Sequence, residues 1–118
     1  MATAARQQAI LPDGKNMVLT QGIADSFGGL IEEFDGTPRD ISSDTLTAQA
    51  WLNDASKTVT VAAASPQTGN TKGRYVVTIP VAALDGTGTF EVNVQNQITG
   101  EPAKLVARVT FTVQAEGS

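Results

Sequence analysis

The sequence predicts an all-β protein, an immunoglobulin-like β-sandwich of about seven strands with a flexible N-terminal arm. Turn-forming clusters of Gly, Pro, Asp and Asn recur at short intervals along the 118 residues and separate short runs rich in Val, Thr, Ile and Phe. Several runs alternate between apolar and polar residues, as a strand with one buried face requires. No segment has the length and the 3.6-residue periodicity of a full helix.

The N-terminal half holds four of the expected strands, in chain order Asn16–Gln21, Gly28–Phe34, Leu46–Leu52 and Lys57–Ala62. The third places Leu and Ala on alternate positions, and the fourth alternates Val with Thr. The Gly pair that begins the second is interpreted as a strand start or a bulge. It lacks the following helix and the Lys-Ser or Lys-Thr ending of a phosphate-binding loop.

The C-terminal half holds the most regular alternation. In Thr89–Gln95 the inward residues are Phe90, Val92 and Val94. In Leu105–Val113 the expected inward residues are Leu105, Ala107, Val109, Phe111 and Val113. The segment Asn96–Lys104 is expected to join these two strands as a hairpin.

A further strand and one helical turn complete the set. Gly73–Ile79 places Tyr75, Val77 and Ile79 on one face. The Ala-rich stretch Pro80–Leu84 predicts a single helical turn, because Pro suits the first position of a helix.

The length fits one domain. We expect the sandwich to occupy residues 13–118 and the first twelve residues to form the arm. The start of the arm is small and polar, so it should be flexible or ordered only by a partner.

The sequence contains no Cys and no His. Disulfides and thiolate metal sites are therefore excluded, and so is a nucleophile activated by His. We expect no enzymatic activity, no cofactor and no bound metal.

The net charge is −4, and the charges of both signs are interspersed. Nucleic-acid binding is not expected, since it needs clustered Lys and Arg. The sequence also shows no signal peptide and no apolar run long enough to cross a bilayer, so a membrane partner is not expected either.

The densest group of acidic residues comprises Glu32, Glu33, Asp35, Asp40 and Asp44. Their spacing matches no calcium-binding loop, and Asp35 with Gly36 already suits a turn. A solvated face is the favoured interpretation, ahead of ion binding or a catalytic carboxylate pair.

Trp51 is the one large anomaly. Strict alternation in Leu46–Leu52 directs it outward, where it would be a contact residue, because Trp is enriched at interface hot spots. A bulge or a register change would instead turn it into the core, as with the Trp of an immunoglobulin C strand. Both interpretations are open at this point.

The order of several motifs resembles the immunoglobulin-like N-terminal domain of phage baseplate upper proteins and related small domains of tailed-phage virion proteins. The most telling motif is strand, Asp-Gly-Thr-Pro at 35–38, Asp-Ile-Ser at 40–42, then strand. The other motifs are Met-Val-Leu-Thr-Gln-Gly at 17–22, Leu-Thr-Ala-Gln-Ala at 46–50, Gly-Arg-Tyr-Val-Val-Thr-Ile at 73–79, Gly-Thr-Phe-Glu-Val-Asn-Val at 88–94 and Leu-Val-Ala-Arg-Val-Thr-Phe-Thr-Val at 105–113. In the motif at 35–42 the turn should be tight, and Ile41 should anchor the connection in the core.

This resemblance implies a structural accessory protein of the virion, assembled in the host cytoplasm and present as a homo-oligomer or in many copies per particle. Its partners would be other virion proteins, either the major capsid protein or proteins of the neck, tail or baseplate. Such domains usually head a longer protein, whereas this sequence ends at Ser118. Capsid decoration is therefore slightly favoured over a tail position.

The residues expected to contact a partner are Arg6, Ile10, Leu11 and Trp51. A carbohydrate-binding or adhesin module for attachment to the host surface is the alternative function. It would need exposed aromatic platforms, and the sequence has one Trp, one Tyr and four Phe.

Overall fold

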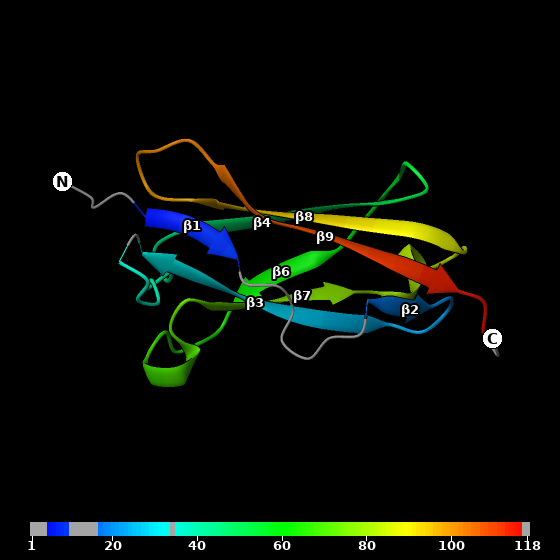
Figure 1. Ribbon diagram of the computed structural model, residues 1–118, viewed down its shortest axis with the longest axis horizontal. Coiled ribbons are helices and arrows are strands. Elements are labelled where there is room, and N and C mark those ends of the chain that lie inside the picture. The colour runs from blue at the N-terminus through cyan, green and yellow to red at the C-terminus, as the bar shows by residue number, and fades with distance from the viewer. Residues whose placement is uncertain (1–4, 10–16, 34, 117–118) are drawn as a thin grey trace.

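The computed structural model describes residues 5–9, 17–33 and 35–116, with the backbone alone for residues 5–9. Two β-sheets pack face to face in the described part of the chain (Figure 1). The first sheet has the strand order β1 (Ala5–Ala9), β3 (Asp25–Glu33), β7 (Arg74–Ile79), β6 (Thr60–Ala63). The second has the order β2 (Val18–Thr20), β9 (Lys104–Gln114), β8 (Gly88–Gln97), β4 (Thr45–Leu52), β5 (Ala55–Lys57).

The only helical pieces among the described residues are two 3₁₀ turns, η1 (Gly69–Thr71) and η2 (Val81–Ala83). The second confirms the expected turn, with Pro80 directly before it. None of the helices that the structure describes has the length and apolar character needed to span a membrane.

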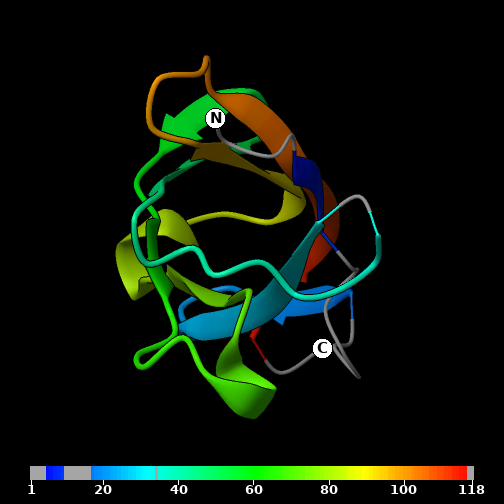
Figure 2. The same ribbon diagram turned by 90° about the vertical axis from the view of Figure 1, so that its left-hand side faces the viewer.

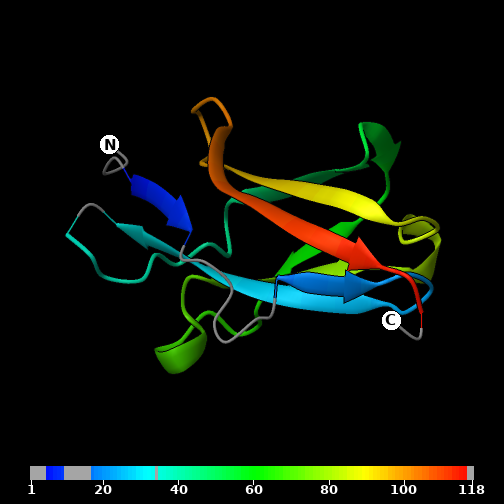
Figure 3. The ribbon, with the colours of Figure 1, turned by 45° about the vertical axis from the view of Figure 1, so that its right-hand side comes forward.

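The first two strands belong to different sheets. β1 runs antiparallel to β3, and β2 runs parallel to β9 (Figure 3). Five of the twelve residues expected to form the arm thus have their backbone in a strand at the edge of the first sheet. The division of the chain at residue 12 and the flexibility of the arm stay predictions.

Figure 2 shows the two layers end-on, and the buried apolar side chains of both sheets form the core. The rings of Phe27 on β3 and Phe111 on β9 meet across it, with 5.4 Å between centroids and a tilt of 51°. Aromatic pairs at such separations stabilise a core beyond the area they bury. Ile41 is also buried and anchors the connection that follows the Asp-Gly-Thr-Pro turn, as expected.

Gln67 explains how that connection is fixed. Its buried side-chain Oε1 accepts hydrogen bonds from the backbone N–H groups of Ile41 (3.1 Å) and Gly73 (2.8 Å). Its Nε2 donates to the carbonyl oxygen of Ala64 at 2.7 Å. A buried amide with these partners costs little desolvation energy, so one Gln holds two loops against the sandwich.

β7 has the alternation that the sequence predicts, with Tyr75, Val77 and Ile79 all buried. Gly29 pairs with Tyr75 in the middle of β3, so the Gly pair is neither a strand start nor a break in the pairing. A Cβ at Gly29 would overlap Cζ and Oη of Tyr75. The absence of a side chain at Gly29 therefore provides the space for the Tyr75 ring. Burial of the Tyr75 phenol raises its pKa to about 12.

The face predicted for the start of β9 was wrong. Val94 pairs with Ala107 and Gln95 with Leu105, so Val106 is an extra residue on β9. This bulge reverses the alternation: Val106 is 6% exposed and Leu105 is 45% exposed. The expected inward position of Leu105 is thus taken by Val106.

The segment Lys57–Ala62 was predicted as one strand, and the structure divides it. β5 ends at Lys57 in the second sheet, and β6 begins at Thr60 in the first sheet. Val59 is buried between them, where the chain crosses from one sheet to the other. This division, together with β1, gives nine strands among the described residues where about seven were expected.

Candidate functional site

Trp51 lies on the outer face of the second sheet. Its neighbours Ala50 and Leu52 are buried (1% and 5% exposed), and the pairing of β4 with β8 runs without interruption from Thr45 to Leu52. No bulge turns the side chain inward, so the interpretation as a core residue was wrong. Trp51 is half-buried on the polar outer face, opposite Glu91 on β8 and Ser56 on β5.

The indole of Trp51 borders two hollows in the surface. The larger, of about 630 Å³, is lined by Trp51, Asn53, Asp54, Thr89 and Glu91. We call it the Trp51 hollow. The smaller, of about 210 Å³, lies on the side of β5 and includes Ser56 and Lys57 among its lining residues. A large aromatic side chain with space on both sides is available for contact.

The tight turn between β4 and β5 gives the Trp51 hollow a fixed wall. Asn53 and Asp54 both have positive φ (49° and 71°), a conformation that Asn and Asp tolerate better than most residues and that suits a two-residue hairpin. The Asn53 side chain donates from Nδ2 to the carbonyl oxygen of Thr87 (2.8 Å) and accepts at Oδ1 from the Thr89 N–H (3.0 Å). Both ends of this amide are occupied, so its role is to position the turn.

Asp54 and Glu91 supply the charge of the Trp51 hollow. Neither carboxylate accepts a hydrogen bond or forms an ion pair with the residues that the structure describes. Lys57 pairs in register with the buried Ala50, so it leaves β5 toward the opposite face from Trp51. There its ammonium contacts Asp85 at 2.8 Å, which lowers the pKa of that carboxyl through a hydrogen bond.

For three of the four residues expected to contact a partner, the structure does not describe the side chain. Ile10 and Leu11 fall outside the described residues, and for Arg6 only the backbone, in β1, is described. Their side-chain contacts lie outside the described part of the chain, and their roles stay predictions.

The acidic cluster is not a single solvated face. Arg39 donates to Asp44 from Nε (2.7 Å) and from Nη2 (3.0 Å), and to Glu33 from Nη1 (3.1 Å). The Asp44 side chain is only 2% exposed, and it also accepts from Nδ2 of the buried Asn96 at 3.0 Å. Planar guanidinium groups favour such paired bonds, and the hydrogen bond to Asp44 raises the pKa of Arg39.

The turn interpretation of the remaining acidic residues is confirmed for Asp35 and extends to Asp40. Asp35 accepts from the hydroxyl (2.6 Å) and the backbone N–H (3.0 Å) of Thr37. Asp40 accepts in the same way from Ser42. These bonds stabilise the charged form, and they hold the pKa of both carboxyls below the ordinary value. No group of three or more metal-ligating side chains converges in the described ranges.

Comparison with known proteins decides the fold. No family model matches the chain, and no curated protein matches it. Among solved structures it is similar to the crystal structure of the Lin-41 filamin domain, with a TM-score of 0.61 and 13% identity over 97% of this chain and 98% of that one. The fold is immunoglobulin-like.

The likeness at 13% identity concerns the fold alone. The described residues thus form a nine-stranded immunoglobulin-like sandwich whose first two strands belong to different sheets.

Proposed function

We propose that this chain is a non-enzymatic binding module of a bacteriophage particle, which attaches to other virion proteins through the surface around Trp51. The observation that carries the binding role is the outward indole of Trp51 between two hollows. Trp is among the residues most enriched at binding hot spots, and a surface position for it needs a reason other than core packing.

The particle context rests on the sequence motifs, above all the turn and anchor over residues 35–42. In the structure Asp35 closes that turn by bonding Thr37, and Ile41 is buried. The motif therefore forms the tight turn and the buried anchor that its residues predict, and the particle context itself rests on the sequence resemblance. Many copies on one particle would add avidity to a modest single contact.

The test is co-sedimentation of the purified chain with virions of the phage whose genome encodes it. We expect saturable binding with a fixed number of copies per particle, and cross-links from the Trp51 surface to one virion protein. An absence of binding to virions and to their capsid and tail subassemblies would contradict the proposal. The identity of the cross-linked protein separates capsid decoration from a neck, tail or baseplate position.

A carbohydrate-binding module is the second candidate, because the Trp51 hollow combines an indole with two carboxylates that have no hydrogen bond or ion pair with the described residues. Sugars stack on aromatic faces and donate hydrogen bonds to carboxylates. Glycan-array binding by the wild type that disappears in a folded Trp51→Ala variant would favour this function. Binding to virions without any glycan signal would reject it.

A further inference from the structure

We propose that the Trp51 hollow receives a cationic side chain, arginine in first place, from the protein to which this module attaches. This inference rests on the proposed function and names the chemistry of the contact. It commits to a basic protein segment as the occupant of the hollow.

The lining of the Trp51 hollow is acidic. Asp54 and Glu91 are two carboxylates on adjacent elements, the β4–β5 turn and β8, and the lining includes no basic residue. Lys57 on the neighbouring β5 forms an ion pair with Asp85 on the other face of that strand. Arg108 lies beside Asn93, at the next outward position of the second sheet, and forms no ion pair with Glu91 among the described residues.

Trp51 adds an aromatic surface to the hollow. Trp51 stands directly opposite Glu91 in the pairing of β4 with β8, so the indole and a carboxylate are neighbours on one face. Trp is the best partner for a cation above an aromatic ring. A guanidinium group can stack on an indole and donate paired hydrogen bonds to a carboxylate, which an ammonium group does less well.

The backbone around the hollow is held by hydrogen bonds. Both polar ends of the Asn53 amide are bonded to the backbone at Thr87 and Thr89, and the Asn53 N–H donates to the Thr89 carbonyl oxygen at 2.9 Å. The turn that carries Asp54 is therefore fixed to the start of β8, the strand that carries Glu91. The backbone positions that carry the two carboxylates are fixed relative to each other, so little backbone entropy is lost when a ligand binds.

The single Trp of the sequence makes the test specific, because the one indole signal in the NMR spectrum reports on the surroundings of Trp51. The probe is N-acetyl-arginine methylamide, and the control is N-acetyl-citrulline methylamide, which has the same shape and no charge. We expect the indole Nε1–H signal to shift saturably with the arginine probe, more weakly at high salt, and not with the citrulline control.

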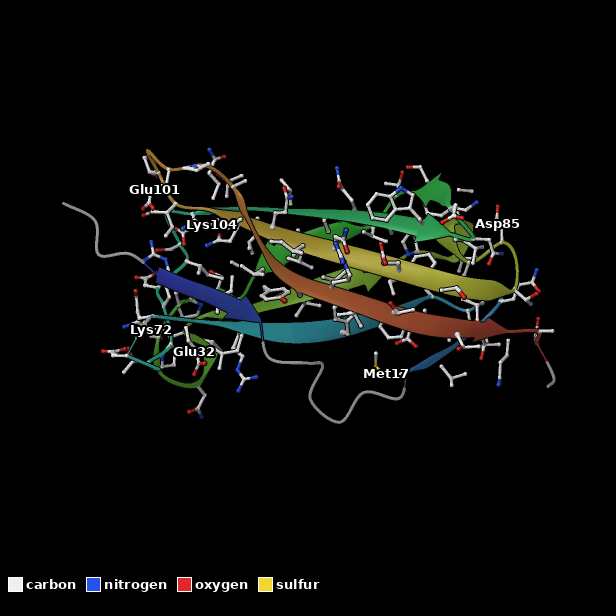
Figure 4. The ribbon with its side chains drawn as sticks, turned by 45° about the horizontal axis from the view of Figure 1, so that its top comes forward. Met17, Glu32, Lys72, Asp85, Glu101 and Lys104 are labelled. Carbon is white, nitrogen blue, oxygen red and sulfur yellow. The ribbon has the colours of Figure 1, made fainter. Side chains whose placement is uncertain are left out.

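Two charge variants sharpen the result. Glu91→Gln and Asp54→Asn each remove one charge, and Asn also tolerates the positive φ at position 54. Each is expected to weaken binding of the arginine probe by about threefold, the effect of an exposed charge pair. The matched control is Glu101→Gln, at the opposite end of the sandwich from Asp85 and the Lys57 that Asp85 holds (Figure 4).

An equal response to citrulline would overturn the inference, and so would unchanged binding in both charge variants. A response to methyl glucoside or methyl galactoside without a response to arginine would overturn the inference and favour the carbohydrate-binding function. The proposed function can fail independently of this inference. Binding of the arginine probe without any binding to virions would refute the proposed virion module. Binding to virions without any response to arginine would refute only the inference about the Trp51 hollow.

Discussion

At the scale of single residues, the inward face of a strand packs the core, and the outward face of β4 carries Trp51, the proposed contact residue. Trp51 lies between two buried residues of β4, and its own side chain faces outward. Tyr75 on β7 has the opposite placement, with its ring in the core over Gly29. The sequence predicted the inward face of β7 from its alternation. The need for a Gly at position 29 was not predictable, because it comes from a pairing partner 46 positions away.

The contact of Gly29 with Tyr75 predicts a large effect for a single methyl group. Gly29→Ala should lower the free energy of unfolding by about 2 kcal/mol, since the Tyr75 ring has to move within a packed core. Urea denaturation measures the loss. Gly86→Ala is the control, because there the added Cβ would lie 3.4 Å from Cδ2 of Leu52, in ordinary contact. Equal effects of the two substitutions would argue against the close approach at Gly29.

The buried phenol of Tyr75 predicts a loss of stability at alkaline pH. Its pKa is about 12 in the folded chain and near 10 in the unfolded chain. Between these values the unfolded state has released the proton and the folded state has kept it, so stability is complete below pH 10 and falls as the pH rises toward 12. The expected loss is about 2 to 3 kcal/mol.

Tyr75→Phe should remove this alkaline loss. The sequence has one Tyr, so the ultraviolet absorbance of tyrosinate also titrates this group alone. A tyrosinate transition near pH 10 in the folded wild type would show that the phenol is solvated.

At the scale of elements, regular alternation located the strands, and irregular pairing decided which residues they bury. β7 and most of β8 have the predicted faces. β9 departs from its pattern at one bulge, whose position depends on the partner strand and leaves no trace in the local sequence. The bonds of Arg39 to Asp44 and Glu33 were not predicted for a similar reason. The order of charged residues in a sequence does not show which of them meet in the folded chain.

The bulge in β9 predicts opposite outcomes for two adjacent residues. Val106→Ala should cost about 2 kcal/mol of unfolding free energy, because two buried methyl groups are removed. Leu105→Ala should change it by less than about 0.5 kcal/mol, since the side chain is 45% exposed. Thermal and chemical denaturation of the pair measure the difference. A larger loss of stability for Leu105→Ala than for Val106→Ala would contradict the bulge and support the uninterrupted alternation that the sequence predicted.

At the scale of the whole molecule, the two sheets present different outer faces. In the first sheet the outward residues of β3, β7 and β6 include small groups such as Gly28, Val76 and Ala62, which pair across the strands. In the second sheet the outer face is polar and carries Trp51 beside Glu91. The fold class followed from composition and turn spacing. The face of the sheet on which the Trp51 indole lies could be assigned only from the pairing register of β4 with β8.

The most direct test of the account compares virion binding by the wild type, Trp51→Ala and Val76→Ala. Val76 is the matched control, because it is an exposed apolar residue (46%) on the outer face of the other sheet. Circular dichroism and the melting temperature establish that all three chains are folded. The account predicts that Trp51→Ala weakens binding by at least about tenfold, as for a hot-spot residue, while Val76→Ala binds like the wild type. Wild-type affinity in a folded Trp51→Ala chain would contradict it.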